Sequence, residues 1–442
     1  MSINNSLPVA VIGAGPVGLA AAAHLSVRNQ PFVLLEAGDT VAANILSWQH
    51  IRIFSPWRYN IDKAARQLLE QTKWIAPDDE ALPTGAELYN LYFKPLSEHP
   101  AIQPHLHLRS KVISIGRKNL DKMKTGGREQ LPFVVRVVEH GEVRSFKAKA
   151  IIDASGTWNS PNPVGSGGVL AIGENENADK IFYGIPDILN THEHRYKNKS
   201  VLVVGSGHSA INAVLELDKL KEKYPLTTVH WILRKKKISD VYGGQEDDAL
   251  EARGALGIKI EQLVNNDRVN VYTPFQIQQL VNENHQLTIV GEQNGNTFAL
   301  PGIDEIISNT GSRPDFSFLR EVRLHIDSSL ESVAEIAELI DPNIHSCGTV
   351  RPHGEKELQH PEKDFYIVGS KSYGRAPTFL MATGYEQVRS IVAAIDGDMV
   401  AARNVELDLP ETGVCSVDGG GGGGCCGVES KPKVKSAEPC CL

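Results

Sequence analysis

The first 36 residues constrain the fold of this chain more than any other stretch. An apolar run starting at Val9 leads into a turn with Gly13, Gly15 and Gly18, then an alanine-rich helical pattern and a second apolar run ending at Glu36. In such a unit the first glycine permits the tight turn, the second admits a pyrophosphate, and the third lets helix and strand pack closely. The acid accepts a hydrogen bond from a ribose hydroxyl. The pattern predicts a dinucleotide site comprising Gly13, Gly15, Pro16, Gly18 and Glu36; a glycine-rich turn of another α/β protein is the alternative.

The second half of the chain repeats this pattern. Gly205, Gly207 and Ala210 take the fingerprint positions after the apolar run SVLVV, and the third position accepts alanine. The next strand ends on cations rather than on an acid, and cations can hold a 2′-phosphate that Glu36 would repel. We therefore expect FAD at the first site and NADPH at the second; a solvated basic strand end is the alternative. The second site is predicted to comprise Gly205, Gly207, His208, Ser209, Arg234 and Lys235.

Further segments connect the two fingerprints. The strand signals FVVRVVE and VRSFKAKAIIDASG, joined at His140-Gly141, predict a hairpin. The glycine and proline cluster that follows indicates a crossing between domains, and Ile303–Leu319 is predicted to be the strand that returns the chain to the first domain. A final helix should begin near Thr383, with the positive end of its dipole towards the flavin. These segments add Ala154, Gly156, Gly369, Ser370 and Thr383 to the expected FAD contacts.

The predicted fold class is α/β, with two Rossmann-like dinucleotide-binding domains and a flexible tail. The FAD-binding domain is expected in two parts, 7–160 and 306–409, around an inserted NADPH-binding domain at 161–305. The stretch 410–442 holds six consecutive glycines and has no apolar period, so it is predicted to be a tether.

Composition narrows the function classes. A formal net charge of −8 argues against nucleic acid as the main partner. No stretch of 18 residues is apolar enough to cross a bilayer, and the first residues lack a basic segment typical of a signal peptide, so a cytoplasmic protein is expected.

Five of the six cysteines lie in the last 28 residues. Thiolates are soft ligands that select thiophilic ions, so this cluster predicts binding of trivalent arsenic, antimony or a soft metal. Incidental thiols in a disordered tail are the alternative. The predicted ligands are Cys415, Cys425, Cys426, Cys440 and Cys441, whereas the body of the chain holds only Cys347.

With both fingerprints, the crossing segment ASGTWNSPNP and the His-rich segment before the second fingerprint, the chain resembles two-dinucleotide-binding-domain flavoproteins. Among them it resembles the flavin-containing monooxygenases, which implies that Asn60 in FSPWRYN lies near the flavin. The family's signature is degenerate here, because Phe182 and Gly184 are present but His192 arrives four residues late. The stretch WQHIRIFSPWRYNID and the cysteine-rich tail also resemble flavoproteins of bacterial arsenic-resistance operons.

These features predict an FAD- and NADPH-dependent monooxygenase that uses molecular oxygen to oxidise a soft nucleophile. Trivalent arsenicals are the substrates that the sequence favours most. Asn60 and Arg58 are the candidate catalytic residues, and Arg375 and Tyr385 are candidate pocket residues. Asn60 could instead cap its own turn, and Arg58 could be a surface cation. The rival functions are an NADPH-dependent flavin reductase of thiols or metal ions acting through the tail, and a non-enzymatic metalloid sensor or chaperone.

Overall fold

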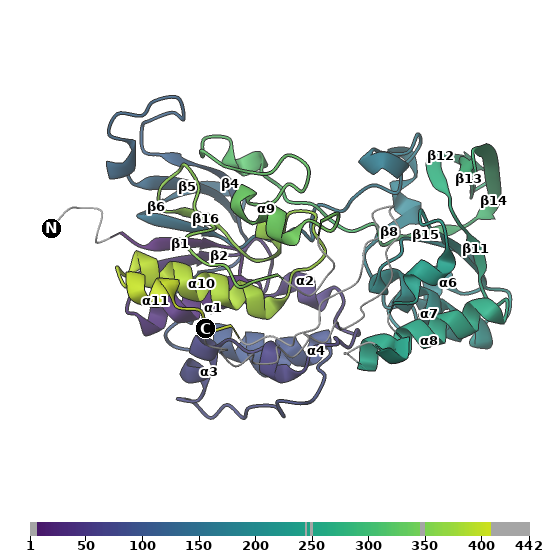
Figure 1. Ribbon diagram of the computed structural model, residues 1–442, viewed down its shortest axis with the longest axis horizontal. Helices are drawn as coiled ribbons and strands as arrows, with labels where there is room; N and C mark the ends of the chain where they lie inside the picture. The colour runs from purple at the N-terminus through teal and green to yellow at the C-terminus, as the bar shows by residue number, and fades with distance from the viewer. Residues whose placement is uncertain (1–6, 244, 248–250, 345–349, 408–442) are drawn as a thin grey trace, which may run out of the picture.

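The computed structural model describes residues 7–243, 245–247, 251–344 and 350–407, and these form two α/β units side by side (Figure 1). The first unit is built on a sheet in the order β16-β7-β1-β2-β3, in which every neighbouring pair is parallel. Val9 of β1 lies opposite Phe32 of β2 and Ala150 of β7. The strands are β1 (Val9–Ile12), β2 (Phe32–Leu35), β3 (Leu106–His107), β7 (Ala150–Asp153) and β16 (Phe365–Ile367).

Helices α1 (Pro16–Val27) and α10 (Met381–Ile395) pack against each other below this sheet in Figure 1. The alanines at 20–23 of α1 are fully buried, because small side chains let the helix lie between the sheet and its neighbours. A Cβ atom on Gly384 would lie 2.5 Å from Cγ2 of Val17, so the two helices approach closely there. The other helical segments of this unit are α2 (Ala43–Leu46), η2 (Trp57–Tyr59), α3 (Lys63–Leu69), α4 (Gly85–Leu88), the π-helical η3 (Tyr89–Phe93), α5 (Lys94–Ser97), η4 (Gln103–His105), η5 (Arg128–Gln130), η10 (Ser317–Leu319), α9 (Ala334–Ile340), η11 (Gly369–Tyr373) and α11 (Met399–Arg403).

An antiparallel meander is inserted between β3 and β7. It consists of β4 (Ser110–Arg117), β5 (Phe133–Glu139) and β6 (Glu142–Ala148). The predicted hairpin is confirmed, and His140 and Gly141 both adopt positive φ angles of 51° and 84°. The prediction of one strand after this turn was wrong: the stretch forms β6 in the meander and β7 in the parallel sheet. All four residues of β7 are buried, whereas β6 is largely exposed, so the two halves suit different sheets.

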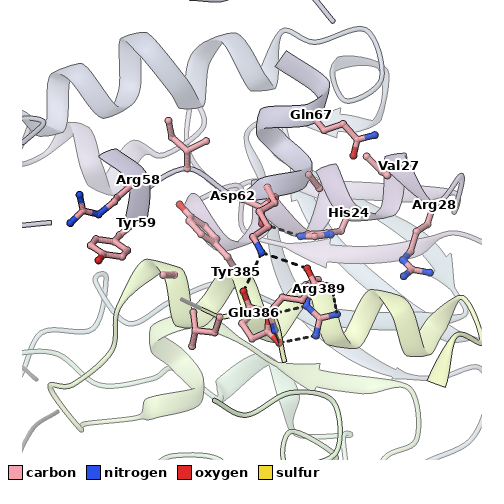
Figure 2. Close-up of a pocket in the computed structure, with 16 residues that line it drawn as sticks. His24, Val27, Arg28, Arg58, Tyr59, Asp62, Gln67, Tyr385, Glu386 and Arg389 are labelled. Carbon is pink, nitrogen blue, oxygen red and sulfur yellow. Dashed lines mark hydrogen bonds and ion pairs between the residues drawn. The ribbon is translucent and has the colours of Figure 1, made fainter. Parts of the chain in front are cut away.

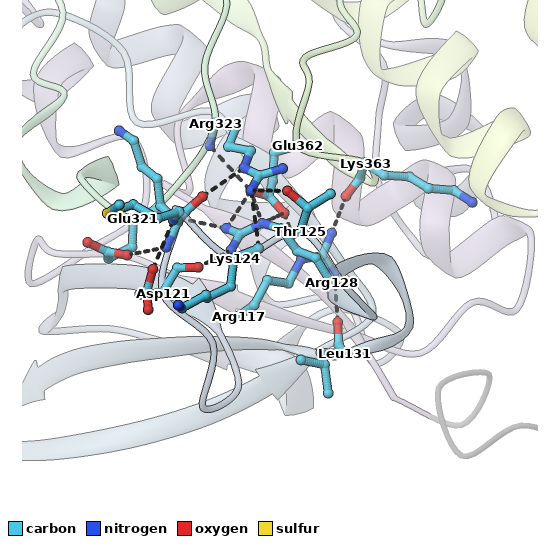
Figure 3. Close-up of polar contacts among 12 residues, drawn as sticks. Arg117, Asp121, Lys124, Thr125, Arg128, Leu131, Glu321, Arg323, Glu362 and Lys363 are labelled. Carbon is cyan, nitrogen blue, oxygen red and sulfur yellow. Dashed lines mark hydrogen bonds and ion pairs between the residues drawn. The ribbon is translucent and has the colours of Figure 1, made fainter.

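The long β4–β5 loop is fastened by a buried group that we call the arginine–glutamate cluster, made of Arg117, Arg128 and Glu362 (Figure 3). Arg117 Nε and Arg128 Nη2 donate to the Glu362 carboxylate at 2.8 and 2.7 Å. The Arg117 guanidinium also lies 3.6 Å from the centroid of the Phe133 ring. The cluster therefore joins the meander to a segment 245 residues away in the sequence.

The second unit contains a parallel sheet in the order β11-β10-β9-β15-β8 and an antiparallel sheet in the order β12-β13-β14. Their strands are β8 (Ile181–Tyr183), β9 (Ser200–Val204), β10 (Thr228–Ile232), β11 (Asn270–Tyr272), β12 (Gln276–Glu283), β13 (Gln286–Gln293), β14 (Asn296–Ile303) and β15 (Glu305–Ser308). Its helical segments are η6 (Ser166–Gly168), η7 (Asn175–Lys180), α6 (Glu193–Tyr196), α7 (His208–Lys223), η8 (Ile238–Val241), η9 (Gln245–Asp247) and α8 (Glu251–Asn265).

Two segments connect the units and pair with each other. The Asn162 amide donates to the Gly311 carbonyl at 2.9 Å, and the Arg313 amide donates to the Ser160 carbonyl at 2.9 Å. The stretch predicted to return the chain to the first domain begins instead with β15, whose buried Ile306 and Ile307 complete the second sheet. The predicted boundary between residues 305 and 306 therefore falls inside β15, and the return crossing starts after Ser308.

Among the described residues, no helix combines the length and the apolar character needed to span a membrane.

Candidate functional site: two dinucleotide cradles

The first fingerprint forms a cradle at the N-terminus of α1. Gly13 has a φ of +91°, and a Cβ atom there would lie 2.8 Å from the Ala154 carbonyl oxygen. A Cβ atom on Gly18 would lie 1.8 Å from the Gly13 carbonyl oxygen, so both positions require glycine. At Gly15, in contrast, nothing lies within 4 Å of the Cβ position. Pro16 starts the helix with no side chain capping its amides, so the positive end of α1 faces this open space.

Glu36 lies beside this cradle, at the end of β2. Its Oε2 accepts a hydrogen bond from the Ala14 amide at 2.7 Å, and its Oε1 accepts one from the Gly38 amide at 2.7 Å. The two backbone donors fix the plane of the carboxylate and leave its other lone pairs unused, as the predicted hydrogen bond from a ribose hydroxyl requires.

The segments at 154–156 and 369–373 meet on the other side of the cradle. A Cβ atom on Gly156, which has a φ of +70°, would lie 3.5 Å from Ser370 Oγ, and one on Gly369 would lie 3.3 Å from Cγ2 of Val17. Thr383 is the third residue of α10, so its amide is one of the helix donors without an intrahelical acceptor. The structure therefore brings the FAD contacts predicted at 154–156, 369–370 and 383 to one side of the first unit.

The second fingerprint forms an equivalent cradle at the N-terminus of α7. Gly205 has a φ of +132°, and a Cβ atom there would lie 2.3 Å from the Asn309 carbonyl oxygen. Nothing lies within 4 Å of the Cβ position of Gly207. His208 and Ser209 are the first two residues of the helix. The His208 ring lies 5.2 Å from the ring of Phe54, so the first unit touches the edge of this cradle.

The two predicted cations after β10 have different surroundings. Lys235 Nζ donates to the Asp240 carbonyl at 2.6 Å, which ties its ammonium to the backbone. Arg234 is exposed at the end of the strand. Of the pair, Arg234 is therefore the better placed to reach a 2′-phosphate.

The candidate catalytic residues lie in the loop before α3. The Asn60 side-chain amide donates to the carbonyls of Ser55 and Pro56, at 2.7 and 2.8 Å. Both of its hydrogens are therefore used within its own turn, as the loop-capping alternative requires. Arg58 is half-exposed and pairs with Glu80, which matches the surface-cation alternative.

Arg58 and Tyr385 border a cavity of about 420 Å³ between α1, α3 and α10 (Figure 2). The Tyr385 hydroxyl donates to the Asn60 carbonyl at 2.9 Å and so ties α10 to the loop. Two pairs of side chains that line the cavity interact with each other, His24 with Asp62 and Glu386 with Arg389, whereas Arg28 pairs with Asp396 and Asp398 outside it. Arg375, the other predicted pocket residue, is exposed and lies beside Gly168 of the second unit.

Sequence reasoning missed a group of titratable residues where the two units meet. His50 of the first unit lies near Pro186 and Asp187 of the second unit, and burial lowers the pKa of His50 despite the nearby Asp187 carboxylate. His192, which the sequence did single out, packs against Phe182 within the second unit, at 5.1 Å between ring centroids, although it comes four residues later than the family signature places it. Burial, reinforced by Asp187, raises the pKa of Glu216 on α7 to about 7. No motif marks His50 or Glu216. The surroundings of His50 depend on how the two units dock, and those of Glu216 depend on Asp187 and Ile188, which precede α6 in the chain.

The predicted metalloid ligands lie outside the described residues. This holds for Cys415, Cys425, Cys426, Cys440 and Cys441, and for Cys347 as well. Within the described ranges there is no cysteine, and no group of three or more His, Asp and Glu residues could hold a metal ion.

The structure has two open cradles, each at a helix N-terminus in its own α/β unit, and two connecting segments that pair with each other. This arrangement defines a two-domain dinucleotide-binding oxidoreductase. The chain belongs to the pyridine nucleotide-disulphide oxidoreductase family, whose model matches residues 10–338. This match confirms the predicted α/β fold with two Rossmann-like units. It also confirms the prediction that the chain is an oxidoreductase.

Three known proteins show the range of the similarity. A ferredoxin–NADP reductase from Lactobacillus johnsonii is 26% identical over 159 residues, which cover 36% of this chain and 43% of that protein. A probable indole-3-pyruvate monooxygenase, YUCCA4 from Arabidopsis thaliana, is 27% identical over 220 residues, which cover 47% of this chain and 43% of that protein. The chain thus matches less than half the length of either relative. The bacillithiol disulfide reductase from Bacillus cereus has the same fold, with a TM-score of 0.66, 19% identity, and coverage of 88% of this chain and 99% of that one.

Proposed function

We propose that this chain is an FAD-containing, NADPH-dependent oxidoreductase. The observation that carries the proposal is the pair of cradles, each with one glycine facing open space and an uncapped helix N-terminus. FAD, when bound, accepts a hydride equivalent from NADPH and passes the electrons on. Glu36 would hold the adenosine ribose of FAD, the amides of α1 its pyrophosphate, and Arg234 the 2′-phosphate of NADPH. The chain's contribution is binding, orientation and exclusion of water.

The specific reaction that we propose is oxidation of a trivalent arsenical with molecular oxygen. One oxygen atom adds to arsenic, the other leaves as water, and NADPH supplies two electrons and, with a solvent proton, the two hydrogens of that water. The soft thiolates of Cys415, Cys425, Cys426, Cys440 and Cys441 would capture the metalloid. A cytoplasmic location would keep these thiols reduced. The monooxygenase relative supports the oxygen chemistry as a class, and the tail cysteines support the choice of substrate.

The competing function is an NADPH-dependent reductase that passes electrons to a disulfide of the tail. It is favoured by the family, whose model is that of the pyridine nucleotide-disulphide oxidoreductases. In this version two electrons from NADPH would convert one tail disulfide into two thiols. The tail itself would then be the redox partner of the flavin.

The deciding experiment follows NADPH oxidation and oxygen consumption together, using FAD-loaded protein with and without a trivalent arsenical. The oxygenase predicts that the arsenical stimulates both in a one-to-one ratio and that the pentavalent product forms. A variant with all five tail cysteines changed to serine should show a higher KM for the arsenical. NADPH oxidation that proceeds without oxygen, and only when the tail is oxidised, would replace the oxygenase with the reductase.

Coenzyme choice tests the second cradle. Replacing Arg234 with alanine should raise KM for NADPH about tenfold or more and change KM for NADH less than twofold, because a charge-assisted hydrogen bond contributes about 1.5–3 kcal/mol. Lys235→Ala is the matched control and should have the smaller effect, since its ammonium is held by Asp240. Steady-state kinetics with both coenzymes measure this. Equal effects of Arg234→Ala on NADPH and NADH would refute the assignment.

A further inference from the structure

The first unit contains a fully buried ion pair that neither fingerprint accounts for. Lys371 Nζ lies 2.7 Å from Asp153 Oδ2, and neither side chain is exposed to solvent. The ammonium also donates to Ser155 Oγ at 3.0 Å, and the Ser155 hydroxyl in turn donates to Asp153 Oδ1 at 2.6 Å. One charge thus connects the end of β7 to the turn that contains Ser370.

The same ammonium reaches both connections between the units. Asp153 and Ser155 begin the outgoing crossing, whereas Phe316 and Phe318 follow the return crossing. Lys371 Nζ lies 4.4 Å from the ring centroid of Phe318 and 5.5 Å from that of Phe316, which is within the range of cation–π attraction.

The turn around Lys371 is held on its other side by α10. The Gly369 amide donates to Gln387 Oε1 at 2.7 Å, and Gln387 Nε2 donates to Ser372 Oγ at 3.0 Å. Ser372 Oγ donates to the Gly369 carbonyl at 2.7 Å. Ser370 differs from these residues, because its hydroxyl faces Gly156 across the cradle. The turn is therefore fixed in a shape that presents Ser370 to the predicted cofactor side.

We propose that Lys371 is a positioning residue: its buried ammonium holds the FAD cradle in a fixed position relative to the two segments that connect it to the NADPH-binding unit. A buried ion pair adds little net stability compared with well-packed apolar residues of similar volume, so stability alone does not explain it. Its hydrogen bonds and ring contacts are directional, and they fix three segments relative to one another. The inference rests on the assignment of 154–156 and 369–370 to FAD.

The test removes both charges in a Lys371→Met/Asp153→Asn double variant, so that no unpaired charge is left buried. FAD affinity is measured on the apoprotein by quenching of flavin fluorescence, and folding by thermal unfolding of the same apoprotein. The dissociation constant for FAD should rise tenfold or more, and amide hydrogen exchange at 157–160 and 313–316 should accelerate. The control is Arg195→Met/Glu305→Gln, an ion pair of the second unit at 2.7 Å whose side chains are 23% and 14% exposed; the FAD affinity of this variant should stay within twofold of wild type.

A second variant covers the case in which the double variant does not fold. Phe318→Leu keeps both charges but removes the closer ring from the ammonium, and it should weaken FAD binding about threefold. FAD affinity within 1.5-fold of wild type in Phe318→Leu, or within twofold in a folded double variant, would overturn the proposal and leave Lys371 a purely structural residue. Failure of the wild-type protein to bind FAD would instead refute the proposed function.

Discussion

Replacing Gly15 with valine is expected to give a folded protein that no longer retains FAD. The Gly15 backbone is extended, with φ −76° and ψ −172°, which valine adopts without strain, and nothing lies within 4 Å of the new Cβ atom. The side chain would instead occupy the space that we propose for the FAD pyrophosphate. Overpacking costs roughly 1–3 kcal/mol, so the dissociation constant for FAD should rise about 10- to 100-fold. Thermal unfolding of the apoprotein should change little.

The second cradle supplies the matched control for this experiment. Gly207 has the same extended backbone and the same open space, so Gly207→Val should weaken NADPH binding and leave FAD binding unchanged. Gly18→Ala should behave differently from both, because its Cβ atom would collide with the Gly13 carbonyl and disturb the fold itself. Gly15→Val protein that binds FAD as tightly as wild type would show that the pyrophosphate does not lie at α1.

The cradles could be predicted from sequence because the properties that matter are local. Gly13 and Gly18 are required by backbone geometry within a single strand–turn–helix unit, and Glu36 follows on the next strand of the same unit. The pairing of β5 with β6 also followed from the two strand signals joined at the His140-Gly141 turn. In each case the sequence neighbours of a residue determine its surroundings.

The remaining features depend on contacts between distant segments, which no spacing encodes. Lys371 reads as a surface lysine in the sequence, and its burial depends on Asp153, 218 residues earlier. The sequence could not show whether the Asn60 side-chain amide is free or bonded to the carbonyls of Ser55 and Pro56, because this depends on how the loop folds. Similarly, the apolar pattern of β15 fits the parallel sheet of either unit. The structure places it in the sheet of the second unit, where Ile306 and Ile307 are buried.

Replacing Glu362 with glutamine should cause a large loss of stability in the first unit. Glu362 lies between two buried guanidinium groups, Arg117 and Arg128, and it also accepts a hydrogen bond from the Arg323 amide at 3.3 Å (Figure 3). Removing one partner of a buried ion pair costs about 3–5 kcal/mol, because the remaining charges stay buried without compensation. Denaturant unfolding of wild type and variant measures this difference. Glu129→Gln is the matched control: its pair with Lys363 is exposed, and its loss should cost less than about 1 kcal/mol.

The pH dependence distinguishes this charge effect from simple loss of packing. Burial alone would raise the pKa of Glu362, but hydrogen bonds from Arg128 and Arg117 hold the pKa below its ordinary value of 4.5. A carboxylate with a lowered pKa contributes its full stability above that ordinary value, and the contribution is lost as the pH falls through the pKa of the folded state. The advantage of wild type over Glu362→Gln should therefore be constant near neutrality and shrink below about pH 4.5. An advantage that does not change between pH 7 and pH 3 would mean that the cluster stabilises the fold by shape rather than by charge.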